Sequence, residues 1–158
     1  MKRIIYFLIL FPIFFFTSEP SQEDYLRIAT NVVPQSVRQG EEGTLKIKIT
    51  PKDGIKISSH PEFIIKLDDN NSLSFSKVFF TSSEMDLQTV QEKEVIFLDL
   101  EKEIEIPFKL KENSLIGKHR ISGEVIFTAV FKDNWSLKTY QKFFTQFRAS
   151  RNSKAKKR

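Results

Sequence analysis

Apolar and polar residues alternate along much of the chain between positions 25 and 147, which is the side-chain period of a β-strand with one buried face. The alternation is clearest over residues 98–110, where six apolar side chains fall on one face, interrupted only by Lys102. Charged residues and Pro107 fall on the other face. Because helical spacing would scatter these apolar side chains around the whole circumference, the pattern predicts strands.

Further segments are predicted as strands because they are rich in β-branched or aromatic residues and are bounded by turn residues. They cover residues 25–33, 44–49, 55–58, 63–67, 73–80, 121–131 and 135–147. Residues 81–93 show neither a strand period nor a helix period, and they are predicted to form a long loop. About eight strands without a convincing helix favour an all-β fold, an antiparallel β-sandwich of two sheets.

The N-terminal segment has the features of an export signal. Lys2 and Arg3 precede an apolar run over residues 4–16 that only Pro12 interrupts. The run is shorter than the roughly 20 residues that a spanning helix needs. We therefore expect residues 1–18 to act as a signal peptide and the protein to be periplasmic or extracellular. A cut after Ser18 would leave Phe16 at position minus three, so both removal of the signal and its retention as an N-terminal anchor stay open.

The remaining chain is expected to form one domain over residues 19–147. With 158 residues, the chain is long enough for a domain with a full core. It contains no cysteine, so no disulfide can stabilise an exported form and the fold must depend on apolar packing. Of the 16 phenylalanines, the eleven that lie outside the signal can fill such a core. Burial of each large apolar side chain is worth about 1.5–3 kcal/mol.

Positive charge is concentrated at the C-terminus. Of the 25 Lys and Arg residues, two lie at the N-terminus and six in residues 148–158, which leaves 17 against 20 Asp and Glu. Residues 148–158 hold no apolar side chain larger than Ala, so they are predicted to be a disordered tail. Such a tail could bind an anionic surface, whereas no specific nucleic-acid site is predicted. The basic residues of the tail are Arg148, Arg151, Lys154, Lys156, Lys157 and Arg158.

Short motifs in a fixed order resemble the N-terminal periplasmic domain of thiol:disulfide interchange proteins of the DsbD family. The matching pieces include the turn and strand of residues 51–57, residues 104–108, Gly117, Gly123 and the run over residues 127–130. The resemblance implies an immunoglobulin-like sandwich in which two cysteines of the last hairpin carry electrons. Val130 stands at the first cysteine position, and Ser136, or Trp135 if the loop register differs, stands at the second.

The missing cysteines exclude the redox reaction, because it requires a thiolate that attacks a disulfide sulfur. What the resemblance still implies is the architecture and a surface that docks other proteins. Exposed aromatic groups there would suit protein contact, although we expect at least two of Trp135, Tyr140 and Phe144 to pack in the core. The candidate partner-binding residues are Val130, Asp133, Asn134, Trp135, Ser136 and Leu137.

No catalytic, cofactor-binding or metal-binding residue is predicted. His60 and His119 adjoin turn residues and have no HxH or HExxH spacing. Glu101, Glu103 and Glu105 share one strand face, which we interpret as a solvated face. Residues 68–71 have the composition of a calcium loop but lack its glycine and late glutamate, so a turn is predicted.

The sequence therefore predicts a non-catalytic protein-binding module of the cell envelope, with an unknown envelope protein as its partner. Two alternatives remain. One is a membrane- or wall-associated attachment protein that acts through the basic tail. The other is a docking accessory of a thiol:disulfide exchange system that has lost the electron-carrying pair.

Overall fold

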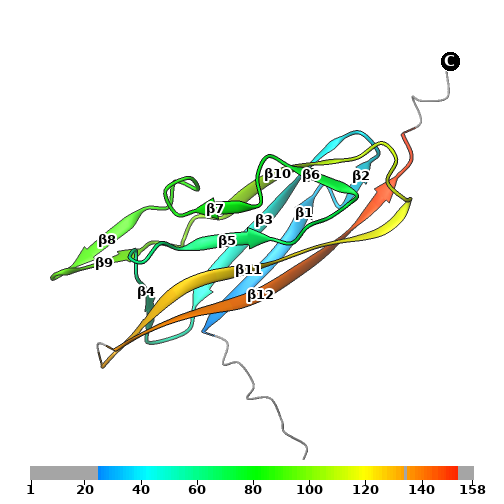
Figure 1. Ribbon diagram of the computed structural model, residues 1–158. Helices are drawn as coiled ribbons and strands as arrows, with labels where there is room; N and C mark the ends of the chain where they lie inside the picture. Colours follow the sequence, from blue (N-terminus) through cyan, green and yellow to red (C-terminus); the bar gives the residue numbers. More distant parts are fainter. Residues whose placement is uncertain (1–24, 134, 153–158) are drawn as a thin grey trace, which may run out of the picture.

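The computed structural model describes residues 25–133 and 135–152, and within these residues the chain forms strands and no helix (Figure 1). None of the described residues therefore forms a helix that is long and apolar enough to span a membrane. The strands are β1 (Leu26–Val33), β2 (Ser36–Arg38), β3 (Glu42–Pro51), β4 (Ile55–Ile57), β5 (Ile64–Leu67), β6 (Leu73–Phe75), β7 (Phe79–Thr81), β8 (Thr89–Glu92), β9 (Val95–Leu98), β10 (Ile104–Leu110), β11 (Gly117–Phe131) and β12 (Ser136–Ser150).

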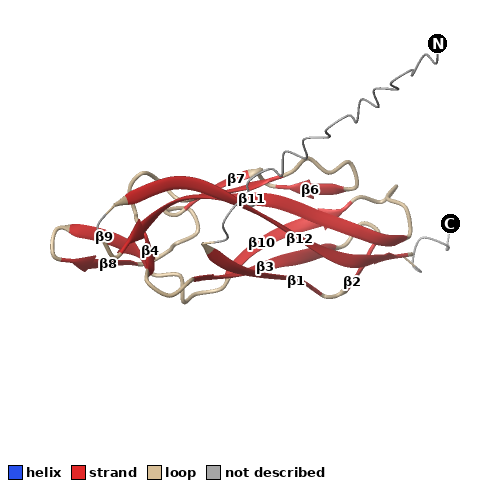
Figure 2. Cartoon of the chain, turned by 90° about the horizontal axis from the view of Figure 1, so that it is seen from below, coloured by secondary structure: helices blue, strands red, loops and turns tan. Residues whose placement is uncertain are grey.

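Two sheets stack to form an elongated sandwich (Figure 2). Sheet A has the order β1-β3-β10-β6, and all its pairs are antiparallel. Sheet B has the order β2-β12-β11-β5-β7, and β4 also pairs with β11. β2 runs parallel to β12, while the other pairs of sheet B are antiparallel. A separate hairpin of β8 and β9 projects from one end (Figure 1).

The strand order is that of an immunoglobulin domain, in which strands A, B, E and D form one sheet and C, F and G form the other. β1, β3, β10 and β6 occupy the places of A, B, E and D, and β5, β11 and β12 occupy those of C, F and G. β7 and the β8–β9 hairpin are inserted between D and E. The predicted all-β, immunoglobulin-like sandwich is therefore confirmed.

The core lies between the sheets and is built from alternate residues of each long strand. Leu45 and Ile47 of β3 and Val125 and Phe127 of β11 are all but fully buried. Gly123 lies where β11 meets β5, and a Cβ there would come within 2.4 Å of the Lys66 carbonyl oxygen. Since no other residue lacks a Cβ, glycine allows this close approach of the two strands.

A side-chain clamp joins the sheets along one edge. The Gln141 side chain on β12 accepts a hydrogen bond from the Leu26 N–H at 3.0 Å and donates one to the Leu26 carbonyl oxygen at 2.7 Å. The Gln141 side-chain amide thus forms the two hydrogen bonds that a neighbouring strand of sheet B would otherwise make with the backbone of Leu26. β1 therefore packs beside β12 while it pairs with β3.

Two predicted strands are each divided in two. Residues 98–110 form the end of β9 and all of β10, because the Asp99 carboxylate accepts a hydrogen bond from the Glu101 N–H and closes a turn. Residues 73–80 supply β6 to sheet A and most of β7 to sheet B. The apolar–polar alternation continues where the chain passes from one sheet to the other, because both sheets bury their inner faces. Periodicity alone therefore does not show which sheet a residue belongs to.

Candidate binding surface at the end of the β11–β12 hairpin

The closed end of the β11–β12 hairpin carries the predicted docking residues. Val130 and Ser136 lie directly opposite each other in the register. The Phe131 N–H donates to the Trp135 carbonyl oxygen at 3.0 Å, so the next pair inward, Val130 and Ser136, is a non-hydrogen-bonded pair. In such pairs the two side chains approach most closely. Ser136, and not Trp135, is therefore the residue that faces Val130.

An aromatic cluster covers the side of the hairpin end that is continuous with the core. The rings of Phe131 and Trp135 are stacked, with centroids 4.0 Å apart and planes 6° from parallel. Tyr25 meets Phe131 edge-on at 5.5 Å. Trp135 nevertheless remains 50% exposed. We call Tyr25, Phe131 and Trp135 the aromatic end of the sandwich.

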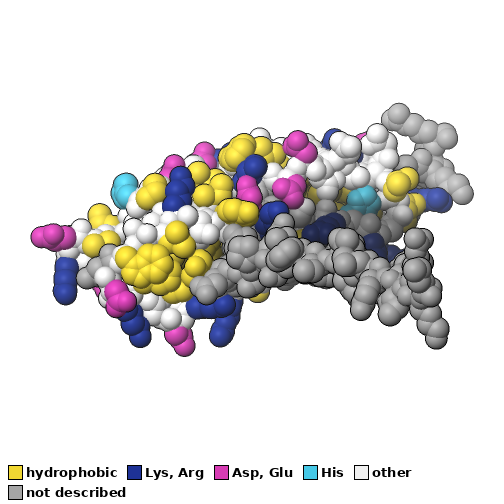
Figure 3. All heavy atoms as spheres, turned by 60° about the horizontal axis from the view of Figure 1, so that its bottom comes forward, with side chains coloured by type: hydrophobic (Ala, Val, Ile, Leu, Met, Phe, Trp, Pro, Cys, Tyr) yellow, Lys and Arg dark blue, Asp and Glu magenta, His cyan; other side chains and the backbone are white. Residues whose placement is uncertain are grey.

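Two hollows flank Phe131. The first, of about 620 Å³, lies among the aromatic end, Lys132, Asp133 and the turn of residues 52–55. The second, of about 690 Å³, lies between Val130 and the β8–β9 hairpin, where Val95 and Phe97 contribute apolar walls. Hydrophobic side chains gather beside charged ones on the face that includes this part of the molecule (Figure 3). The end therefore offers apolar recesses with a charged rim.

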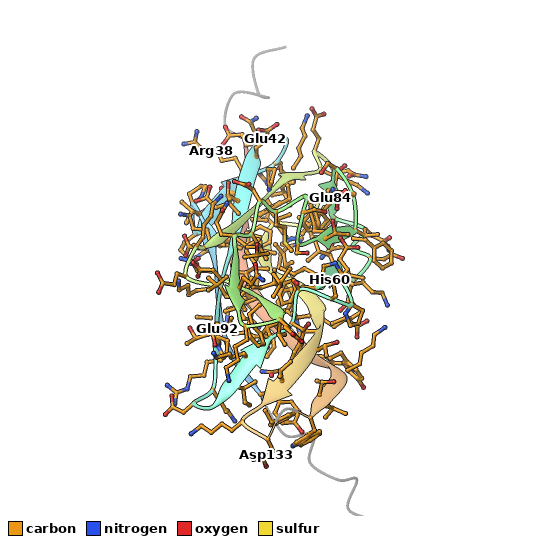
Figure 4. All side chains as sticks on the ribbon, turned by 90° about the vertical axis from the view of Figure 1, so that its left-hand side faces the viewer. Arg38, Glu42, His60, Glu84, Glu92 and Asp133 are labelled. Atoms are coloured by element: carbon orange, nitrogen blue, oxygen red, sulfur yellow. The ribbon has the colours of Figure 1, made fainter. Side chains whose placement is uncertain are left out.

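The β8–β9 hairpin is held beside β4 by backbone and side-chain bonds. The Ser59 N–H and hydroxyl both donate to the Ile96 carbonyl oxygen, at 3.0 and 2.9 Å. Lys56 forms an ion pair with Glu92 and lies 5.0 Å from the centroid of the Phe97 ring. In Figure 4, Glu92 and Asp133 both lie in the half of the molecule opposite Arg38 and Glu42.

The sequence prediction missed this hairpin, because it treated residues 81–93 as a loop. Val90, Val95 and Ile96 of the hairpin are exposed. With both faces largely in water, β8 has no apolar–polar alternation to detect. The remaining signal was the pair of β-branched runs around Glu92, Lys93 and Glu94, and Lys93 indeed adopts a positive φ of 55° there.

The predicted docking residues are brought to one end, but they lie on different faces. Val130 and Ser136 point to one side of the hairpin, and Trp135 and half-buried Leu137 point to the other. Asp133 is exposed in the turn, and Asn134 lies outside the described residues.

The prediction that at least two of the three aromatic residues pack in the core was wrong. Trp135, Tyr140 and Phe144 are all exposed, so none belongs to the core. They also do not cluster, because Tyr140 and Phe144 occupy even positions of β12 and so point away from the side that Trp135 occupies. The core positions of β12 are taken by Phe143, Phe147 and Ala149 instead.

The first residues of the predicted basic tail belong to a strand instead. Arg148, Ala149 and Ser150 are the last residues of β12, where they pair in parallel with β2. Ala149 is fully buried, which gives this apparently polar segment one apolar anchor. Arg151 follows the strand and is exposed. Lys154, Lys156, Lys157 and Arg158 lie outside the described residues, as do residues 1–24.

Some of the titratable groups form ion pairs with one another. Among the described residues, no group of three or more His, Asp or Glu side chains is placed to hold a metal ion. Lys46 pairs with Glu105 at 2.8 Å and with Glu103 at 3.0 Å, and these hydrogen bonds raise the pKa of Lys46 above its usual 10.5. His119 Nε2 lies 2.6 Å from the Leu115 carbonyl oxygen, and His60 is exposed.

Comparisons with known proteins find no matching family model and no significant match among curated proteins. The solved structure of an aspartate-to-alanine variant of BcpA, the major pilin subunit of Bacillus cereus, is similar with a TM-score of 0.44 and 10% identity. That match covers 78% of this chain and 40% of the pilin chain, so this chain spans less than half of the pilin. A chain from a type I cohesin–dockerin complex of Clostridium thermocellum has a TM-score of 0.39 and 15% identity, over 82% of this chain and 100% of that one. For murine CRIg the TM-score is 0.30 at 8% identity, over 80% of this chain and 99% of that one.

Proposed function

We propose that this protein is a non-catalytic module of the cell envelope that binds a protein partner through the aromatic end and its two hollows. The observation that carries the proposal is the exposed indole of Trp135, which is held in a fixed position by its stack on Phe131. Tryptophan is enriched among the residues that dominate binding energy at protein interfaces. A ring that is already ordered loses little conformational freedom on binding.

The surroundings of Trp135 also favour a protein ligand. The hollow beside the β8–β9 hairpin combines apolar walls from Val95, Phe97 and Val130 with charged groups from Glu92 and Lys132. An apolar centre with a polar rim is the usual anatomy of a protein interface. The partner is expected to insert apolar side chains on either side of Phe131.

A second candidate, docking to thioredoxin-like proteins of the envelope, is favoured by the opposed pair Val130 and Ser136. If the resemblance to the DsbD-like domain holds, these residues stand at its two cysteine positions, and the strand order of the two sheets is compatible with that relationship. The docking surface would then have outlasted the redox chemistry.

The proposal is tested by placing a photo-reactive amino acid at Asp133 in the full-length chain and cross-linking in the native envelope. The control position is Asn31, which is exposed on the outer face of sheet A. A partner that cross-links from Asp133 and not from Asn31 is then purified for direct binding measurements by calorimetry. Thioredoxin-like envelope proteins are assayed in the same way.

Trp135→Ala should weaken binding of that partner about tenfold or more, the range typical of a residue that dominates an interface. Phe79→Ala is the matched control, because Phe79 is an equally exposed aromatic residue on β7. Equal cross-linking from both positions, or wild-type affinity in the Trp135→Ala variant, would contradict the proposal. Binding of a thioredoxin-like protein that Trp135→Ala abolishes would support the second candidate.

A further inference from the structure

The outer face of sheet B carries an exposed row of basic and aromatic side chains. Along β12, every second residue from 138 to 148 points outward and is exposed. The aromatic members are prominent, with Tyr140 44% exposed and Phe144 57% exposed. We call this set the β12 row; it consists of Lys138, Tyr140, Lys142, Phe144, Gln146 and Arg148.

The outer face of sheet A has neither the excess of positive charge nor the exposed aromatic side chains. Its central lysine, Lys46, is neutralised by ion pairs with Glu103 and Glu105. Among the described residues of that face, no aromatic side chain is exposed. The excess of positive charge on β12 is therefore a property of one face and not of the whole sandwich.

The carboxylates on the outer face of sheet B are engaged by neighbours. Glu124 of β11 is half-buried and forms an ion pair with Lys66 at 3.1 Å. Asp68, just after β5, accepts a hydrogen bond from the Ser122 hydroxyl at 2.7 Å. Outward residues of β11 such as Ser122 and Ile126 are only half-exposed, whereas the outward residues of β12 are exposed. A flat partner therefore has freer access to the cations and rings of β12 than to half-buried Glu124.

The contact that covers one face of the Phe144 ring indicates which anionic partner this surface can bind. The guanidinium of Arg120 lies over the Phe144 ring, 4.2 Å from its centroid. Proteins that bind single-stranded nucleic acid use open ring faces on which bases stack, and here one face of the ring is already covered. A bilayer interface makes no such demand, since it accepts an aromatic ring between the headgroups while lysine and arginine reach the phosphates.

We propose that the β12 row is a binding face for an anionic phospholipid bilayer. Lys138, Lys142 and Arg148 contact lipid phosphates, and Tyr140 and Phe144 enter the headgroup layer. Ten residue steps of about 3.3 Å make the row about 33 Å long. At its end β12 leads directly to Arg151, which is exposed and extends the same charge. Because Trp135 lies on the other side of β12, the bilayer leaves the aromatic end open to a protein partner.

The test is sedimentation of the full-length protein with vesicles of phosphatidylcholine alone and of phosphatidylcholine with phosphatidylglycerol. The vesicles without charge measure any binding through the apolar residues 4–16. Lys138→Ala/Lys142→Ala should lower the affinity for anionic vesicles by about tenfold or more, because each basic residue near an anionic membrane surface adds to the free energy of binding. Lys48→Ala/Lys109→Ala removes the same charge from sheet A and should leave that affinity nearly unchanged. Equal losses in the two double variants would overturn the proposal.

A truncated variant that ends at Asn152 distinguishes the contribution of the tail from that of the β12 row. Without the tail, binding should weaken but should still depend on Lys138 and Lys142. If the two double variants then bind alike, the tail alone is the adhesive element and the proposal fails. Binding of oligothymidylate that requires Lys138 and Lys142, without binding to anionic vesicles, would assign the row to nucleic acid and would also overturn it.

A fluorescence measurement gives an independent readout. Trp135 is the only tryptophan, so Trp135→Phe/Phe144→Trp moves the single reporter to the β12 row. Emission of this variant should shift to shorter wavelength when anionic vesicles are added, whereas emission from Trp135 in the native chain should not. A shift from Trp135 and none from position 144 would show that the aromatic end enters the bilayer and would refute the assignment to the row.

Discussion

Thr128 is buried on β11, and its hydroxyl has no hydrogen-bond partner among the described side chains and backbone. Burial of an unpaired hydroxyl costs about 1–3 kcal/mol. Thr128→Val keeps the branched shape that suits a strand and removes the unpaired group. We expect the free energy of unfolding in urea to rise by about 1 kcal/mol.

Thr50→Val serves as the control, because Thr50 is exposed on the outer face of β3 and its replacement should change stability little. Should Thr128→Val lower the stability instead, the hydroxyl must be bonded in solution, for instance to a buried water.

Glu84 is a second residue whose surroundings set a measurable property. The hydrogen bond from Lys77, followed by those from the Thr81 N–H and hydroxyl, lowers the pKa of Glu84 from 4.5 to about 2. A carboxyl group whose pKa is lower in the folded state stabilises the fold above pH 4.5, and that contribution is lost as the pH falls toward 2. NMR titration of the Glu84 carboxyl carbon should give a midpoint near 2.

The Glu84→Gln variant should be less stable than the native protein near pH 6, and the difference should shrink as the pH falls from 4.5 toward 2. The difference is expected to be small because the group is exposed. A carboxyl midpoint near 4.5 would mean that the contacts with Lys77 and Thr81 do not persist in solution.

Single residues also show why the candidate surface was only partly predictable. The order of motifs alone matched Val130, and either Ser136 or Trp135, to the two cysteine positions of the DsbD-like domain. The strand register shows that Ser136 is the residue opposite Val130. The orientation of Trp135, Tyr140 and Phe144 was not predictable from composition, because residues of one strand point to opposite sides according to parity. Which parity is buried depends on the facing sheet, and on β12 the core took the odd residues through Phe143 and Phe147.

At the scale of elements, the β11–β12 register makes a strict prediction. Cα atoms of a non-hydrogen-bonded antiparallel pair lie about 4.5 Å apart, within the 4.4–6.8 Å range of disulfides. Val130→Cys/Ser136→Cys should therefore form a disulfide on oxidation, measured as the loss of two free thiols per chain. Val130→Cys/Lys138→Cys is offset by two residues, to about 7–8 Å, and should stay reduced.

If the offset pair oxidised as readily as the opposed pair, the hairpin would have a different register in solution. The position of Ser136 opposite Val130 would then lose its basis.

Strands were predicted correctly where one face of the strand is buried, and they were missed where both faces are exposed to solvent. β3 and β10 alternate strictly, since one face is in the core and the other in solvent. β8 is exposed at all four positions and gave no signal, and β2 has only Val37 to mark it. Pro61 lies between the predicted segments that became β4 and β5, and proline has no N–H to donate to a neighbouring strand.

At the scale of the whole molecule, the class of fold was predictable and the inventory of strands was not. Alternation shows that sheets exist, but the pairing of β2 with β12 and of β7 with β5 depends on contacts between segments that are apart in the sequence. The β8–β9 hairpin is local, but β8 is exposed at every position and gave no alternation. This hairpin matters, because it forms one wall of the larger hollow. The parts that a local pattern could not predict are thus parts of the candidate surface.

The parallel pairing of β2 with β12 has a mechanical consequence. The described chain enters beside the aromatic end, where Tyr25 contacts Phe131, and leaves at the far end, where the Asn152 amide donates to the Gln39 carbonyl oxygen (Figure 1). Tension applied between these two points draws β2 and β12 along their lengths in opposite directions. Their hydrogen bonds are then loaded in shear, all at once, and cannot unzip one after another. The sandwich is therefore built to resist stretching along its long axis.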